Sequence, residues 1–390
     1  MAGRRGEGGN GGGGPVRRVA IVSDWCLPRR GGIETHILAL ARHLRQAGVA
    51  AEILTSFPGP DEIDGVRIVR VATARLPLAG IAVSPLLVGT LRTRLAAGRY
   101  DIVHLHPSQV APFCLAGSVA AERLGLPAVA TFHSLMGVLA PILRVAERLT
   151  GWPPERLAMT GVSSLIAGQV EAAMPGRRVG VLPNGFDAPF WTAAARAGGE
   201  EGRGVRLVSA MRLQGRKRPV ALLDIFAKAL ELAGPAGEGA TLTMAGDGPL
   251  RARLERRAEA AGLAGRVSFA GWLDAPALRG LYAGSDLFVM PSTRESFCIA
   301  ALEARAAGLP VLGMARTGMR DFIRDGGNGE LAADDADMAR RLARLLGDRA
   351  GLARLAAEGE GLAPFRWEAV VARHMEVYRA AAAASRSRST

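Results

Sequence analysis

Two carboxylates stand eight positions apart in the run Glu295-Ser-Phe-Cys-Ile-Ala-Ala-Leu-Glu303. The apolar run at 285–292 before them predicts a short strand, and the helical periodicity of 297–307 predicts a helix after it. Glu295 is then in the loop, and Glu303 is about two turns into the helix. The first amides of this helix lie between them and suit a phosphate. Two carboxylates that flank an anion site fit a molecule with hydroxyls at both ends and a pyrophosphate between them, as in a nucleotide-sugar.

A pair of cations lies upstream of the carboxylates. Arg212 and Lys217 follow an apolar strand predicted at 205–210 and come just before a predicted helix. From such a loop the two side chains can reach one anion, Arg212 as a planar fork and Lys217 as a point charge. A generic basic loop is the alternative. The chain has only two lysines among its 49 basic residues, which favours a specific role here. We expect the neighbouring Arg216 and Arg218 to face solvent.

Paired glycines form a third element near the N-terminus. Gly31 and Gly32 follow a strand predicted at 19–23 and precede a helix predicted at 33–47. Because glycine has no side chain, a ligand can closely approach its backbone and the amides of the helix. We predict phosphate contact here, with an ordinary tight turn as the alternative.

In this order, the three elements resemble the retaining GT-B glycosyltransferases, in particular the large family 4. The family's hallmarks are Gly-Gly-x-Glu near the first helix, an Arg followed five residues on by Lys, and a Glu-x7-Glu pair, and the sequence carries all three. The resemblance covers roughly 18–380, and one departure is Cys298, where the family usually has Gly. Smaller matches are Leu182-Pro-Asn-Gly-Phe186, Ala245-Gly-Asp-Gly-Pro249, Phe269-Ala-Gly-Trp272 and Phe365-Arg-Trp-Glu368.

The resemblance implies a role for each of these residues. Glu303 would form hydrogen bonds with the ribose hydroxyls, with a solvated helix carboxylate as the alternative. Glu295 would form one with a hydroxyl of the donor sugar, with an ordinary acid near the helix N-terminus as the alternative. Arg212 and Lys217 would neutralise the leaving diphosphate, where charge grows in the transition state. His133, at a strand end, would contact the sugar and complete the catalytic set, with core packing as its alternative. The other donor contacts would be Gly31, Gly32, Asp247, Ser296, Phe297, Cys298 and Ile299.

The acceptor side is less clearly marked. Trp25, Arg29 and Arg30 lie in the first loop, where the arginines suit a phosphorylated or anionic acceptor. His104 and His106 stand at another strand end and could line this side, with a structural role as the alternative.

Strands and helices alternate along the chain, which predicts an α/β fold with mostly parallel sheets and helices on both faces. The predicted strands are 19–23, 50–55, 66–71, 102–105, 128–132, 159–162, 179–182, 205–210, 240–245, 266–270, 286–290 and 310–313. We divide the chain into a disordered Gly/Arg-rich tail at 1–17, an N-terminal Rossmann-like acceptor domain at 18–187, a C-terminal Rossmann-like nucleotide-sugar-binding domain at 188–365, a helix at 366–383 and a disordered tail at 384–390. The GT-B resemblance implies that the domains face each other across a cleft and that this helix crosses back to the first domain.

Composition narrows the function classes. Apolar residues make up 49% of the 390, which excludes global disorder. The three cysteines are far apart and lack metal-ligand spacing, which argues for a reducing cytoplasm. The net charge of +13 admits nucleic acid, anionic lipid or phosphorylated substrates, but the arginines are scattered and no nucleic-acid-binding motif is present. No apolar run reaches the roughly 18–20 residues that span a bilayer. We expect a cytoplasmic protein, and action at the inner face of the membrane stays open.

The resulting hypothesis is a retaining transfer of a hexosyl unit to a hydroxyl acceptor. The donor would be GDP-mannose or a UDP-sugar, and the acceptor a glycolipid, an inositol-type molecule or a polysaccharide. We expect no cofactor beyond the nucleotide-sugar co-substrate, and no metal, since no acidic cluster resembles a metal-binding Asp-x-Asp. The alternatives are a GT-B sugar-nucleotide epimerase and a non-catalytic binder of nucleotide-sugar or anionic membrane. A dinucleotide dehydrogenase is disfavoured, because neither first turn reads Gly-x-Gly-x-x-Gly.

Overall fold

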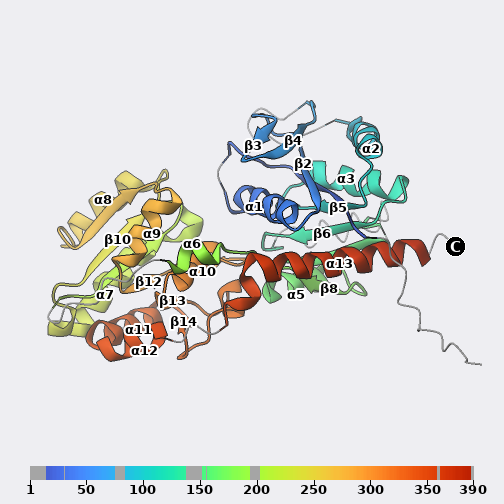
Figure 1. Ribbon diagram of the computed structural model, residues 1–390. Helices are drawn as coiled ribbons and strands as arrows, with labels where there is room; N and C mark the ends of the chain where they lie inside the picture. The colour runs from blue at the N-terminus through green and yellow to red at the C-terminus, as the bar shows by residue number, and fades with distance from the viewer. Residues whose placement is uncertain are drawn as a thin grey trace, which may run out of the picture. The chain divides into compact units, whose positions relative to one another are not determined.

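A computed structural model describes residues 15–29, 31–74, 84–137, 152–154, 156–193, 203–357 and 361–387. The chain forms two compact units, whose helices and strands are labelled in Figure 1. Unit 1 comprises Met1–Gly161, Gln169–Leu182 and Val371–Thr390, and unit 2 comprises Val162–Gly168 and Pro183–Val370.

Unit 1 contains an eight-stranded sheet in the order β3-β4-β2-β1-β5-β6-β7-β8. Every neighbouring pair is parallel except β3 and β4. The central strands β1, β5 and β6 are buried almost throughout, as expected for a parallel sheet covered on both faces. The strands are β1 Arg18–Ser23, β2 Ala50–Thr55, β3 Glu62–Ile63, β4 Val66–Arg70, β5 Ile102–Leu105, β6 Ala128–Phe132, β7 Leu157–Gly161 and β8 Val179–Val181.

The helices of unit 1 cover this sheet. Helix α1 (Gly32–Gln46) packs on β2 and β4 through an apolar face that includes Ile37, Leu40 and Leu44. Helices α2 (Leu87–Gly98) and α3 (Pro112–Arg123) pack side by side, and α3 contacts β1 and β5 (Figure 1). Helix α5 (Ser164–Ala173) begins in unit 2 and ends in unit 1.

Unit 2 contains a six-stranded, fully parallel sheet in the order β11-β10-β9-β12-β13-β14. Its strands are β9 Arg206–Ala210, β10 Thr241–Ala245, β11 Val267–Gly271, β12 Leu287–Val289, β13 Val311–Met314 and β14 Gly329–Ala332. Its helices are α6 Ala188–Thr192, α7 Pro219–Ala233, α8 Arg251–Ala260, α9 Ala275–Ala283, α10 Ile299–Ala306, α11 Asp335–Gly347 and α12 Arg349–Ala357. Helix α7 packs against α8 and α11, and α10 packs against α6 (Figure 1). The fold is therefore α/β, as predicted.

Each sheet has one place where the strand order reverses. Strand β1 lies between β2 and β5 in unit 1, and β9 lies between β10 and β12 in unit 2. In open parallel sheets, ligands bind beyond the carboxyl ends of the strands at such a switch point. The loops after β1, β5, β9 and β12 are therefore the places to look for a site.

The last helix, α13 (Trp367–Ser387), starts in unit 2 and belongs to unit 1 from Val371 onward. The prediction of a disordered tail from 384 is wrong for 384–387, which are helical. An alanine-rich stretch favours the helix, and Ala381, Ala382 and Ser385 are buried against unit 1. Of the helices in the described residues, none has both the length and the apolar character needed to cross a bilayer.

Candidate active site

Lys217 and Glu295 form an ion pair at the switch point of unit 2. Lys217 ends a 3₁₀ turn, Gly215–Lys217, after β9, and Glu295 lies in the loop after β12. The ammonium Nζ donates to Oε1 of Glu295 over 2.6 Å. Glu295 is 5% exposed, and its charge is stabilised by the adjacent cation. An ammonium has three N–H donors, so two stay available to an anion while one holds Glu295.

The loop that carries Glu295 is clamped by neighbouring backbone. The amide of Gly318 donates to the carbonyl of Glu295 over 3.0 Å, and the hydroxyl of Ser163 donates to the carbonyl of Ser296 over 2.6 Å. A Cβ at Gly318 would lie 2.0 Å from that Ser296 carbonyl oxygen. Only glycine fits at position 318. Together, the hydrogen bonds from Gly318 and Ser163 form a clamp that fixes the backbone on which Glu295 lies.

Phe297 anchors the same loop in the core. Its side chain is 1% exposed and packs against Phe322 and Phe365, with ring centroids 5.3 and 5.8 Å away. The ring therefore faces away from the site, and only its backbone remains for the predicted donor contact.

Helix α10 starts at the residue that departs from the family pattern. Cys298 is its N-cap with φ 77°, a left-handed conformation that glycine adopts without strain. The amides of Ile299 and Ala300 have no acceptor among the described residues. They carry the partial positive charge of the helix N-terminus, beside the Lys217–Glu295 pair.

Glu303, one turn into α10, has no hydrogen-bond or ion-pair partner among the described residues. Its side chain keeps some solvent contact, yet burial of the carboxyl group raises its pKa to about 8. Burial raises the pKa of the Cys298 thiol to about 12, and that pKa also responds to Glu295, Lys217 and Glu303. Glu303 thus lies on the same helix start as Cys298, with hydrogen-bonding capacity that the described residues do not use.

Arg212 and Asp247 are exposed in the loops after β9 and β10. These loops touch through their backbones, since a Cβ at Gly246 would lie 1.9 Å from the Met211 carbonyl oxygen. The amide of Leu213 also donates to the carbonyl of Asp247 over 2.9 Å. Close packing of the two loops thus explains the glycine at position 246. Contact of Arg212 and Asp247 with a ligand stays a prediction.

The expectation that Arg218 faces solvent is wrong. Its guanidinium donates to the Pro291 carbonyl over 3.0 Å and to both carboxylate oxygens of Asp335 over 2.9 and 2.5 Å. The backbone of Arg218 has φ 57° and turns the chain into α7. Arg218 therefore ties the loop after β9 to the end of β12, which helps to hold Lys217 near Glu295.

In unit 1, Gly31 and Gly32 open α1 as predicted. Gly31 has an extended backbone, but a Cβ there would lie 2.4 Å from Oε2 of Glu34. Glu34 is 2% exposed and forms an ion pair with Arg29. A side chain at position 31 would thus force the Glu34 carboxylate to move, and phosphate contact by the two glycines stays a prediction.

Arg29 lies on the indole of Trp25, with its guanidinium carbon 4.2 Å from the ring centroid. The indole Nε1 donates to the Ser108 hydroxyl over 3.1 Å. The Arg29 side chain is 39% exposed, so a positioned cation faces solvent after β1. Arg30 lies outside the described residues.

The structure does not support the acceptor-side prediction for His104. The ring is fully buried, with Nδ1 2.7 Å from the Tyr378 hydroxyl and Nε2 2.7 Å from the Thr131 hydroxyl. His106 is fully buried too, and its Nδ1 lies 2.9 Å from Nε2 of His133. Strand alternation places residues 104 and 106 on the same face, beneath the sheet edge rather than on the surface.

Sequence reasoning missed that His36 of α1 joins these histidines. One nitrogen of each of His36, His106 and His133 lies within 4.8 Å of the others, a spacing that could hold a metal ion. Sequence spacing alone gave no metal-ligand pattern. The signal that could have revealed the cluster is the alternation of His104 and His106 at the end of a central strand.

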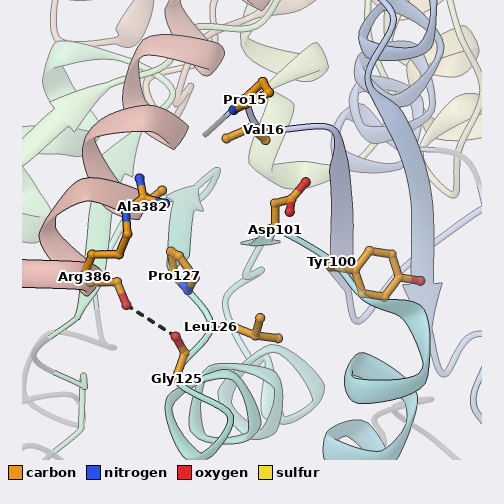
Figure 2. Close-up of a pocket in the computed structure, with 10 residues that line it drawn as sticks. Pro15, Val16, Tyr100, Asp101, Gly125, Leu126, Pro127, Ala382 and Arg386 are labelled. Carbon is orange, nitrogen blue, oxygen red and sulfur yellow. Dashed lines mark hydrogen bonds between the residues drawn. The ribbon is translucent and has the colours of Figure 1, made fainter. Parts of the chain in front are cut away.

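A hollow of about 330 Å³ lies elsewhere in unit 1. Figure 2 shows Val16, Asp101 and Pro127 around it, at the amino ends of β1, β5 and β6, beside the end of α13. The Asp101 carboxylate already accepts from the amides of Arg17 and Arg18 over 2.8 Å. The hollow is at the wrong edge of the sheet for the candidate site.

Two Rossmann-like sheets in one chain, with charged loops at the carboxyl ends of their switch-point strands, are typical of the GT-B glycosyltransferase fold. Comparison with known proteins agrees. The family described as Glycosyltransferase Family 4 matches residues 30–189, and that described as Glycosyl transferases group 1 matches residues 194–361.

Individual proteins give the same result. The chain is 30% identical to the D-inositol 3-phosphate glycosyltransferase of Thermomonospora curvata, over 94% of this chain and 96% of the relative. It is 26% identical to the phosphatidyl-myo-inositol mannosyltransferase of Mycobacterium leprae, over 94% and 97%. The crystal structure of Anabaena HepE with UDP superposes with a TM-score of 0.73 at 19% identity, over 93% of this chain and all of that one. The chain belongs to glycosyltransferase family 4, which confirms the predicted family and the GT-B fold.

Proposed function

We propose that this glycosyltransferase moves a hexosyl unit from a UDP-sugar to a hydroxyl of a phosphorylated, inositol-type acceptor, with retention at the anomeric carbon. The observation that carries the proposal is the Lys217–Glu295 pair beside the open amides of α10. A cation, free amides and two carboxylates at one switch point match the diphosphate and hydroxyls of a nucleotide-sugar.

The choice of a UDP-sugar rests on a structural relative. Anabaena HepE was solved with UDP and with UDP-glucose. Glu303 would accept hydrogen bonds from both ribose hydroxyls, which suits a carboxyl that lacks a partner among the described residues. GDP-mannose is the rival donor, and the mycobacterial mannosyltransferase gives it weight.

The choice of acceptor rests on similarity to D-inositol 3-phosphate glycosyltransferases and on Arg29. D-inositol 3-phosphate glycosyltransferases are 30% identical to this chain over almost its full length. Arg29 presents a half-exposed guanidinium after β1, and a guanidinium binds phosphate through paired hydrogen bonds. Glycolipids and polysaccharides are the rival acceptors.

In the proposed reaction, Lys217 and Arg212 stabilise the leaving diphosphate as its negative charge grows. Glu295 holds a hydroxyl of the transferred sugar and favours the positive charge that develops at the anomeric carbon. The acceptor oxygen attacks from the face that the diphosphate leaves, and its proton passes to a diphosphate oxygen. The cations supply the neutralisation that a divalent metal supplies in other transferases, so we expect activity without added metal.

The test is a transfer assay with purified protein and a chelator present. UDP-glucose, UDP-N-acetylglucosamine and GDP-mannose are each combined with inositol phosphate, with phosphatidylinositol vesicles, or with no acceptor. We expect nucleoside diphosphate release with a UDP-sugar and inositol phosphate, and a product whose anomeric configuration by NMR equals that of the donor.

The chain offers a matched control, because its two lysines differ in setting. Lys217→Met removes the ammonium of the site, whereas Lys228→Met removes an exposed one that pairs with Glu231. Transfer should be lost in the first variant and kept in the second. Conversion of the donor without an acceptor would favour an epimerase. Binding of the nucleotide-sugar without turnover would favour the non-catalytic alternative.

A further inference from the structure

Five of the six histidines in the sequence are buried in unit 1. They are His36, His104, His106, His133 and His374. Ring centroids lie 4.1 Å apart for His104 and His106, and 5.1 Å apart for His106 and His133. So many imidazoles in one interior are unusual, because histidine is only intermediate in its tendency to be buried. The hydrogen bonds of these rings determine which nitrogen carries the proton.

The bonds around His104 determine its tautomer. The hydroxyl of Thr160 donates to the carbonyl of Ala130 over 3.2 Å, so its single proton is used. The hydroxyl of Thr131, 2.7 Å away, must then donate to Thr160 and accept from Nε2 of His104. His104 therefore carries its proton on Nε2, and the Tyr378 hydroxyl donates to its Nδ1. This chain of bonds runs in one direction, from α13 through β5 and β6 to β7.

His106 and His133 form a second hydrogen-bonded pair, two residues beyond His104 and Thr131. His106 follows His104 by two positions and His133 follows Thr131 by two, so strand alternation puts each pair on one face. Nδ1 of His106 lies 2.9 Å from Nε2 of His133, and one of these nitrogens must donate to the other. Nε2 of His106 is buried without a hydrogen-bond partner.

The unpartnered atom decides the direction of this bond. A buried N–H without an acceptor is rare in native structures. The unpartnered Nε2 of His106 is therefore assigned as the unprotonated nitrogen of the ring. The proton of His106 is then on Nδ1 and is donated to Nε2 of His133. The proton of His133 is left on its own Nδ1, which is not among the buried atoms that lack a partner. His133 is also the least buried of the five, at 7% exposed.

We propose that His106 is a positioning residue that holds His133 as its Nδ1–H tautomer, so that His133 offers a hydrogen-bond donor to an oxygen of the bound sugar. The inference deepens the proposed function and rests on it, together with the contact between His133 and the donor sugar that the family resemblance implies. It requires both rings to be neutral. Burial lowers the pKa of His133 to about 3 and that of His106 well below its usual value, which agrees.

The tautomer restricts what His133 can do. A ring that presents N–H toward the ligand binds an oxygen lone pair and does not remove a proton. His133 then contributes recognition and orientation of the sugar, and the proton of the acceptor goes elsewhere, in line with the proposed transfer to the diphosphate. Under the proposed function, the oxygen that His133 would bind belongs to a hydroxyl or another acceptor group of the hexosyl unit.

A metal centre is the rival explanation of the cluster. Nitrogen ligands of a tetrahedral zinc ion at 2.0–2.1 Å would lie about 3.3 Å from each other. The separation of 2.9 Å between His106 and His133 is instead that of a hydrogen bond. His36 also has other contacts. The hydrogen bond is therefore the better explanation.

The test reads the tautomer directly. Full-length protein labelled with ¹⁵N-histidine is examined by long-range ¹H–¹⁵N correlation, which distinguishes Nδ1–H from Nε2–H rings, and the signals of His133 are assigned with a His133→Gln variant. We expect His133 as Nδ1–H. In His106→Asn the amide N–H₂ stands where Nδ1 was, so this tautomer should persist. In His106→Leu it should be lost.

Activity supplies the second readout. His106→Leu should lower kcat about 10- to 100-fold with little change in the KM for donor, as a misplaced contact does, and His106→Asn should restore most of it. Circular dichroism and melting curves identify any variant that fails to fold, and the wild-type spectrum alone then decides.

Three results would overturn the inference: Nε2–H for His133 in the wild type, an unchanged tautomer in His106→Leu, or joint shifts of His36, His106 and His133 with one equivalent of zinc. Because the spectra need no substrate, failure of the proposed function shows separately, as an intact tautomer without transfer from any donor.

Discussion

The ammonium of Lys217 and the carboxylate of Glu295 meet at 2.6 Å between the carboxyl ends of β9 and β12. These strands are neighbours in the sheet, although 78 residues separate the two side chains in the sequence. The pair is held on one side by Arg218 and on the other by the clamp around Ser296. A charged pair that is mostly buried adds little to stability compared with apolar packing. Stability alone therefore does not explain the pair, and the proposed function gives it the role of binding the nucleotide-sugar.

Glu303 predicts how donor binding depends on pH. Its carboxyl group has a pKa of about 8 in the free protein, so it is mostly protonated at neutral pH. If Glu303 accepts hydrogen bonds from the ribose hydroxyls as a carboxylate, ligand binding lowers its pKa and releases the proton of the carboxyl group. Affinity for a nucleotide-sugar should then rise with pH, by up to about tenfold per unit below pH 8, and level off above.

Calorimetry with UDP-glucose between pH 6 and 9 measures this dependence. Glu303→Gln cannot titrate and should bind with an affinity that changes little over the range. The role assigned to Glu303 is contradicted by a wild-type profile that is equally flat.

Gly318 predicts a loss of both stability and activity in one substitution. A Cβ in Gly318→Ala would come within 2.0 Å of the Ser296 carbonyl oxygen and push the loop that carries Glu295. We expect a cost of about 1–3 kcal/mol in urea unfolding and a marked drop in transfer. Gly280→Ala is the control, because Gly280 lies in α9 with open space around its Cβ position. Equal behaviour of the two variants would show that the clamp is unimportant.

The left-handed backbone of Cys298 predicts that glycine is a more stable replacement than alanine at this position. A non-glycine residue in the left-handed region costs about 1–2 kcal/mol, and Cys298 has φ 77°. Both Cys298→Gly and Cys298→Ala lose the thiol, but only the glycine variant relieves the backbone. Urea unfolding should place Cys298→Gly about 1 kcal/mol above Cys298→Ala. The opposite order would mean that the α10 turn is not strained.

The hydrogen bond between the Tyr378 hydroxyl and Nδ1 of His104 predicts a measurable contribution to the stability of unit 1. Tyr378→Phe leaves Nδ1 of His104 buried without its donor, which should cost about 1–3 kcal/mol. Glu376→Ala, an exposed position on the same helix, should cost far less. Chemical unfolding of both variants checks this, and equal values would show that the hydroxyl contributes nothing.

Much of the fold could be predicted because buried parallel strands are continuous apolar runs. Strands β2, β5 and β6 match their predicted bounds residue for residue. Strand β14 was missed because it is four residues long and contains Glu330, whose charge is met by Arg341 and Arg344 from α11. Helix α5 was missed because its small residues give a weak apolar pattern.

The candidate site was predictable where a residue's role depends on its own loop. Alternation of strands and helices places the loops of Lys217 and Glu295 at the same edge of one parallel sheet. Their contact also depends on the strand order, in which β9 and β12 are neighbours. Arg218 was wrongly assigned to solvent because its partner, Asp335, is 117 residues away. The approach of His36 to His133 likewise depends on how α1 packs on the sheet, which no local pattern encodes.

The most direct test of the central claim compares a nucleoside diphosphate with its nucleoside. Calorimetry would measure UDP and uridine, and GDP and guanosine, against the wild type, Lys217→Met and Lys228→Met. If Lys217 grips the diphosphate, the wild type and Lys228→Met should prefer one diphosphate strongly over its nucleoside. Lys217→Met should lose about tenfold or more of that preference while nucleoside binding stays the same. An equal preference in all three proteins would contradict the account.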